Sequence, residues 1–147
     1  MTTSPLSPGE AAVADPDDVR GLQLRLLLAV LLLGSGAAHL PVMEEHLREA
    51  AWMGSLFAAF AVATAALAAA VALSGRREPV AWAGALCVLA LLAYAATRLF
   101  AFPQLSDDVG DWAEPWGIVS VVLEVYAAAL AFLIGYRARE RDRLRSG

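Results

Sequence analysis

Residues 51–73 read AWMGSLFAAFAVATAALAAAVAL, and this stretch decides the fold of the chain. It lies within a run from Ala50 to Gly75 that holds no charged residue. A helix needs about 20 apolar residues to cross the hydrocarbon core of a membrane. The apolar residues here are continuous and do not alternate as they would in an outer-membrane strand. The stretch therefore predicts a transmembrane α-helix.

Three more stretches have a similar length and composition. We predict spans at about 22–40, 80–102 and 116–136, in addition to 51–73. Only Arg98 interrupts the third span and only Glu124 the fourth. The chain is 59% hydrophobic with a mean hydropathy of +0.59, above the usual range of soluble domains. Its 147 residues leave room for one domain, which we expect to be an all-α bundle of four transmembrane helices over residues 21–137.

The first span has an alternative interpretation. An apolar stretch followed by small residues, Gly34-Ser35-Gly36-Ala37-Ala38, is also typical of a cleaved signal peptide. An acidic tail precedes this span, however, and its apolar character continues to Met43. Signal peptides begin with a basic segment, so we favour a helix that is retained.

Arginine placement predicts the orientation in the membrane. Arginines lie before the first span, between the second and third, and after the fourth, whereas the other two loops are acidic. Cytoplasmic loops carry an excess of Lys and Arg, so both ends are expected in the cytoplasm, with residues 1–20 a disordered tail and 138–147 a basic tail. The absence of Lys and Asn fits a GC-rich bacterial genome, and we expect a bacterial inner or plasma membrane.

Small residues and prolines suggest how the spans pack and end. Alanines recur at four-residue intervals at 61, 65 and 69, and also at 81 and 85, a spacing that favours close approach of membrane helices. Pro41 and Pro103 are expected to stop the first and third helices, since proline cannot continue a helix hydrogen-bond ladder. Each is followed by an acidic pair and a tryptophan, so duplication of a two-helix unit is an open alternative to generic outer loops.

Glu124 and Arg98 are the first candidate site. Glu124 lies nine residues after Pro115, which places it about 13 Å below the membrane boundary at 1.5 Å per residue. A charge at that depth costs several kcal/mol unless it is paired or neutralised. The long Arg98 side chain could extend outward to the surface or reach Glu124 as a buried pair. The pair, or a protonatable Glu124, would form part of a proton, ion or ligand site, and the alternative is a structural pair that fixes the register of two helices. Tyr94 and Tyr126 could line an associated pocket.

The second candidate site is a rim of histidines and acids outside the membrane. His39 and His46 are seven residues apart, which is about 10 Å along an unbroken helix and too far for one metal ion. Pro41 lies between them, and a turn there would bring them together. Imidazole and carboxylate are ligands for divalent ions, so the rim is a candidate metal site. Its members are His39, His46, Glu45, Glu49, Asp107, Asp108 and Asp111.

Missing motifs narrow the function. The sequence holds no phosphate-binding glycine loop, no His-Glu-x-x-His zinc motif and no Gly-x-Ser-x-Gly nucleophile. Cys87 is the single cysteine, so no disulfide forms within the chain. We therefore expect an accessory or assembly subunit that contacts the bilayer and a membrane partner or its own copies, and no nucleic acid. The alternatives are a metal-binding or proton-coupled small transporter, and a membrane enzyme acting on a lipid or quinone.

Overall fold

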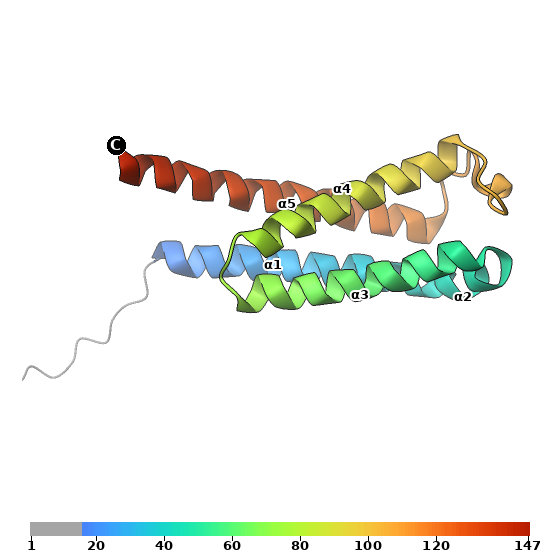
Figure 1. Ribbon diagram of the computed structural model, residues 1–147, viewed down its shortest axis with the longest axis horizontal. Coiled ribbons are helices and arrows are strands. Elements are labelled where there is room, and N and C mark those ends of the chain that lie inside the picture. Colours follow the sequence, from blue (N-terminus) through green and yellow to red (C-terminus); the bar gives the residue numbers. More distant parts are fainter. Residues whose placement is uncertain (1–15) are drawn as a thin grey trace, which may run out of the picture.

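The computed structural model describes residues 16–147 and shows an all-α bundle (Figure 1). The long helices run roughly parallel or antiparallel, and successive helices are joined at alternate ends of the bundle. This confirms the predicted fold class. The elements are α1 Pro16–Ala38, α2 Leu40–Glu49, α3 Ala51–Leu73, α4 Glu78–Leu99, the 3₁₀ turn η1 Ser106–Asp108, and α5 Pro115–Ser146.

The first span is longer than predicted, because α2 continues α1. The two form one rod, Asp17–Glu49, that is long and apolar enough to cross a membrane. His39, the residue between them, keeps right-handed helical angles with φ −84° and ψ −16°. Pro41 lies in the first turn of α2, where a missing N–H costs little. The expectation that Pro41 stops this helix was therefore wrong.

The third helix ends earlier than predicted. α4 stops at Leu99, and Phe100 is extended with φ −128° and ψ 138°. This end lies four residues before Pro103. The chain then folds back over the end of α4, since the N–H of Gly110 donates to the carbonyl of Arg98 at 3.0 Å. Residues 100–114 form a compact return segment rather than an extension of the span.

The fourth helix begins at a well-formed cap and continues far beyond the predicted span. The carboxylate of Glu114 accepts hydrogen bonds from the backbone N–H groups of Trp116 and Gly117, and Pro115 occupies the first turn. α5 then continues to Ser146, so the predicted basic tail is helical. In the predicted N-terminal tail, residues 16–20 belong to α1, and residues 1–15 lie outside the described residues.

A link between α5 and the turn before α4 ties this extension to the bundle. The guanidinium of Arg77 donates to both carboxylate oxygens of Asp142, and the longer of the two bonds is 2.9 Å. These hydrogen bonds, with the charge of Asp142, raise the pKa of the Arg77 side chain. The contact joins the last turns of α5 to the start of α4 at the surface of the bundle.

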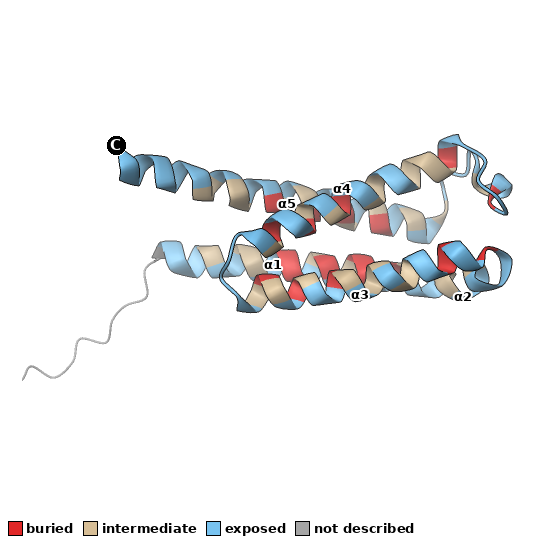
Figure 2. Ribbon diagram, viewed as in Figure 1, coloured by how far each residue is buried: buried red, intermediate tan, exposed pale blue. Residues whose placement is uncertain are grey.

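The core lies where α1 meets α3 and α5, and where α5 meets α4 (Figure 2). Leu28 and Leu32 of α1 are wholly buried, so this helix packs as part of the bundle. The other central members are small or medium side chains, including Val71, Ala83 and Ala127. A second cluster, Ala50, Met53 and Leu105, joins the α2–α3 turn to the return segment.

The packing faces of the helices differ from the predicted alanine rows. On α3 the buried positions include Thr64, Ala68 and Val71, whereas Ala65 and Ala69 are exposed. Close approach instead depends on glycine. A Cβ at Gly36 would lie 2.4 Å from Oγ1 of Thr64 and 3.3 Å from Cα of Ala61, so α1 and α3 nearly touch there.

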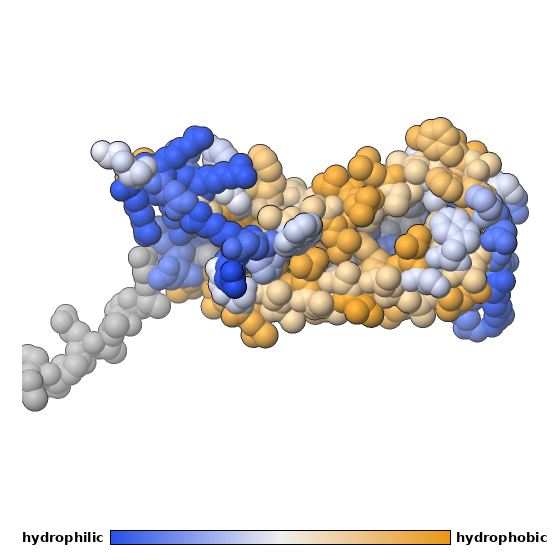
Figure 3. Space-filling view, viewed as in Figure 1, coloured by the Kyte–Doolittle hydropathy of each residue, from blue (hydrophilic) through white to orange (hydrophobic). Residues whose placement is uncertain are grey.

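The outer surface of the bundle is apolar between two polar ends (Figure 3). Large side chains face outward along its middle, including Val62 at 71% exposure and Phe132 at 75%. Hydrocarbon accepts such side chains, whereas water does not. Four helices are long and apolar enough to cross a membrane. The exposed tryptophans lie near the helix ends, as is usual at membrane interfaces: Trp52, Trp82, Trp112 and Trp116.

Candidate functional site

Glu124 lies at the centre of the bundle, sealed between α5 and α1. Only 1% of its surface is exposed. The hydroxyl of Ser35 on α1, which is also wholly buried, donates to Oε1 of Glu124 at 3.1 Å. This bond joins two helices at a depth where neither group has water to replace the other. The pair therefore links α1 to α5.

Thr64 adds a third buried polar group on the neighbouring helix α3. Its hydroxyl donates within α3 to the carbonyl of Phe60 at 3.0 Å, and its side chain lies against Gly36. Gly36 directly follows Ser35 on α1. The last turn of α1 thus presents a polar contact to α5 and a close contact to α3 at almost the same level.

Arg98 is also buried, at 8% exposure, but its partner is not Glu124. Its Nη1 lies 3.3 Å from Oδ1 of Asp108 in the return segment, and its guanidinium carbon lies 4.8 Å from the centre of the Tyr94 ring. The expected Arg98–Glu124 ion pair is therefore replaced by two separate contacts. Arg98 is in the last turn of α4, at the membrane boundary, and Glu124 is more than two helical turns into α5.

The Arg98–Asp108 contact predicts an asymmetric response to mutation. Asp108→Ala should lower the free energy of unfolding by about 2 kcal/mol, because it leaves a buried guanidinium without its acid. Breaking a fully buried pair costs roughly 3–5 kcal/mol, and the smaller value reflects the 28% exposure of Asp108. Arg98→Met should cost less, since Asp108 can be hydrated. Denaturant titration of both variants in mild detergent measures the difference, and equal losses would contradict it.

The predicted tyrosines do not share a pocket. Tyr94 and Trp112 line a small apolar cavity of about 350 Å³ between α4 and α5. Tyr126 is 64% exposed and faces away from the core. Neither Glu124 nor Arg98 lines this cavity. Of the four residues expected to share a pocket, only Tyr94 lines this cavity.

The two histidines lie along one face of the α1–α2 rod and contact the same aromatic ring. The centres of the His39 and His46 rings are each 5.0 Å from the centre of the Phe57 ring on α3. Nδ1 of His39 is hydrogen-bonded to the carbonyl of Ser35 at 2.9 Å, and Nδ1 of His46 to the carbonyl of Val42 at 2.8 Å. The helix continues through Pro41, so the two rings are not folded together as a shared metal site requires.

The acids of the rim are spread over several local contacts. Asp108 binds Arg98, Asp111 accepts from the N–H of Ala113 at 3.2 Å, and Asp107 accepts from the hydroxyl of Ser106 at 3.3 Å. Glu45 and Glu49 are exposed on α2. Among the residues that the structure describes, no three His, Cys, Asp or Glu side chains are gathered as a metal site needs.

The fold and the buried polar contacts define a class: a multi-pass membrane protein built as a bundle of four long α-helices. No protein-family model matches the chain, and neither the curated proteins nor the solved structures include a match.

Proposed function

We propose that the chain is a non-catalytic membrane subunit that acts by binding copies of itself or another membrane protein. The observation that carries the proposal is the burial of Glu124, whose carboxyl group is hydrogen-bonded to Ser35 and has no access to solvent. Neither described cavity is lined by Glu124. Its hydrogen bond joins α1 to α5, as a structural contact does, and a transport pathway would need an opening toward it.

The return segment is the part of the bundle best suited to a protein partner. Phe100 is 63% exposed, Val109 43% and Trp112 49%, although this segment lies beyond the end of α4. The cluster of Ala50, Met53 and Leu105, together with the Arg98–Asp108 contact, holds the segment in place. Exposed aromatic side chains on an ordered surface favour a protein interface, because such interfaces are enriched in Trp and Phe.

The proposal includes the orientation of the chain in the membrane. Nine of the eleven arginines lie at the end formed by the starts of α1 and α4 and the last residues of α5. The positive-inside rule places this end in the cytoplasm and the return segment outside. The partner would then be met at the outer face of a plasma membrane.

Association in lipid bilayers tests the proposal. Fluorescently labelled chains in vesicles should show two or more photobleaching steps per spot at protein-to-lipid ratios where random co-occupancy predicts one. Phe100→Ser/Trp112→Ser should reduce this association about tenfold or more, since buried aromatic anchors each contribute about 1–2 kcal/mol to an interface. The control is Leu144→Ser, which removes a still more exposed apolar side chain at the opposite end.

Two outcomes would contradict the proposal. One is a monomeric wild-type chain that also stays monomeric when co-reconstituted with the proteins encoded beside it. The other is ion transport by the chain alone, seen as dissipation of a pH gradient in vesicles that Glu124→Gln abolishes while leaving the fold intact. That second result would establish the transport alternative instead.

A further inference from the structure

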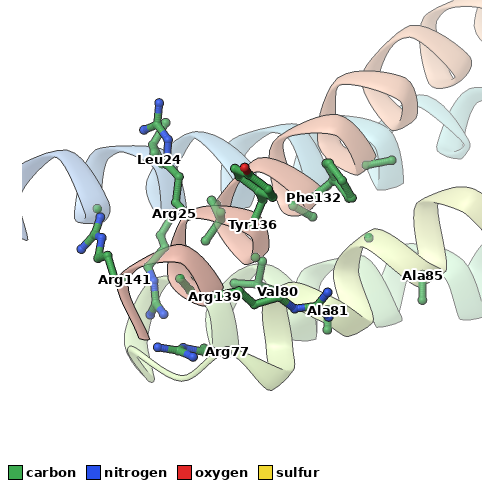
Figure 4. A pocket seen from close by; sticks show the side chains of 18 of the residues that line it. Leu24, Arg25, Arg77, Val80, Ala81, Ala85, Phe132, Tyr136, Arg139 and Arg141 are labelled. Atoms are coloured by element: carbon green, nitrogen blue, oxygen red, sulfur yellow. The ribbon is translucent and has the colours of Figure 1, made fainter. Parts of the chain in front are cut away.

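A large groove opens at the end of the bundle that carries most of the arginines, which we call the basic end. It has a volume of about 1040 Å³ and lies between α4 and α5, beside the start of α1. Its lining changes in character along its length. Arginines surround the mouth, and aliphatic and aromatic side chains continue from it into the apolar part of the bundle (Figure 4).

The mouth of the groove is strongly cationic. Figure 4 shows Arg25 of α1, Arg77 before α4, and Arg139 and Arg141 of α5 among the side chains that line the groove, with Arg139 and Arg141 extending from opposite sides of α5. The full set of lining arginines is Arg25, Arg77, Arg137, Arg139, Arg141 and Arg145, and Asp142 is the one acid among the lining residues.

Most of this positive charge is available to a ligand. Asp142 is bound to Arg77, and Arg25 donates to the backbone carbonyl of Arg76 at 2.9 Å. Within residues 16–147, no ion pair engages Arg137, Arg139 or Arg141. Guanidinium groups bind phosphate oxygens through paired hydrogen bonds, so the mouth fits a phosphate ester.

The rest of the groove fits a hydrocarbon chain. Val88, Leu89 and Leu92 of α4 and Phe132 of α5 line it, and all four are exposed. From Arg77 to Leu92 the helix rises about 22 Å at 1.5 Å per residue. One leaflet of the hydrocarbon core is about 15 Å thick, so the groove runs through a whole leaflet. Gly135 also lines the groove, and nothing lies within 4 Å of where its Cβ would be, so the position has space for a larger side chain.

We propose that this groove binds an acidic glycerophospholipid, with its phosphate among the arginines and one acyl chain along α4 and α5. Basic pockets between membrane helices are suited to acidic head groups. A soluble phosphate would use only the mouth, and a zwitterionic lipid would bring a cation of its own into the arginine cluster. Only an acidic lipid complements both the charge and the apolar wall.

Native mass spectrometry of the full chain in mild detergent tests the site, with phosphatidylglycerol and phosphatidylcholine as probes. The wild-type chain should retain one phosphatidylglycerol under conditions that strip phosphatidylcholine. Arg139→Ala/Arg141→Ala should weaken this binding about 25-fold, since each arginine near an anionic head group contributes roughly fivefold. The matched control is Arg20→Ala/Arg143→Ala, which removes the same charge from the same end at positions outside the groove.

A second variant tests the acyl part of the groove separately. Gly135→Leu places a side chain in open space without a clash, and it should reduce phosphatidylglycerol retention while leaving the arginines in place. Inorganic phosphate should compete only weakly. Phosphate that displaces the lipid completely would indicate a site for a soluble anion and would overturn the proposal.

Three other results would also overturn it: equal retention of the two lipids, equal losses in the test and control arginine variants, or unchanged retention in Gly135→Leu. Should a variant fail to fold, binding to the wild-type chain at low and high salt decides the question. Retention of phosphatidylglycerol should fall at high salt, because salt screens the exposed arginines. Retention that is the same at low and high salt would contradict binding by these arginines.

Discussion

Gly36→Leu is expected to lower the free energy of unfolding by about 3 kcal/mol, at the upper end of what overpacking costs. A Cβ alone at this position would lie 2.4 Å from Oγ1 of Thr64, and the rest of a leucine side chain has no space between α1 and α3. Backbone of Ala61, whose Cα would be 3.3 Å away, cannot rotate aside as a side chain can. The helices must separate, and the effect can be measured by denaturant titration in mild detergent.

Two variants separate this clash from a general effect of replacing glycine. Gly21→Leu lies on the same helix with nothing within 4 Å of its Cβ, so it should leave stability near the wild-type value. Gly36→Ala should be rescued in part by Thr64→Ala, which removes the nearest atom. Equal losses in Gly21→Leu and Gly36→Leu would show that α1 and α3 do not approach each other at Gly36.

The second large effect concerns Glu124. Glu124→Ala should be about 3 kcal/mol less stable than Glu124→Gln, because truncation leaves a void where α5 meets α1 and removes the acceptor of the Ser35 hydroxyl. The glutamine keeps both the volume and an oxygen that can accept. Since both variants remove the carboxylic acid, their difference isolates packing and hydrogen bonding from the cost of burying that group.

Ser35→Ala provides the partner measurement. In the glutamate background it should cost about 0.6–2 kcal/mol, the usual range of an interhelical hydrogen bond in a membrane. In the Glu124→Ala background it should cost almost nothing, since the bond is already gone. Additive losses in the double variant would show that the two residues do not interact.

The sequence predicted the number and type of helices well, because hydrocarbon permits only long apolar helices with internally satisfied backbones. It predicted their ends poorly. Pro41 interrupts a hydrogen-bond ladder but is compatible with a first turn, so the helix continues through it. α4 ends at Leu99, where Phe100 is extended and the N–H of Gly110 returns to the carbonyl of Arg98, a long-range contact that no local pattern encodes.

Partner choice was harder to predict than burial. Arg98 and Glu124 are both buried, as their positions in apolar runs implied. Their partners, Asp108 and Ser35, come from a folded loop and from another helix. One signal was present: Ser35 is a polar residue in the middle of a span, where an unmatched hydroxyl is unfavourable. The small residues on either side of Ser35 are also typical of a signal-peptide cleavage site, which is a competing interpretation of the same stretch.

The 32-residue helix α5 has a mechanical consequence. At 1.5 Å per residue it is about 48 Å long, against a hydrocarbon core of about 30 Å. Its last turns therefore extend past the hydrocarbon core to the level of the lipid head groups, where Asp142 links them to Arg77. Anisotropy of a fluorophore attached after Gly147 would therefore report on motion of this end of α5 at the membrane surface.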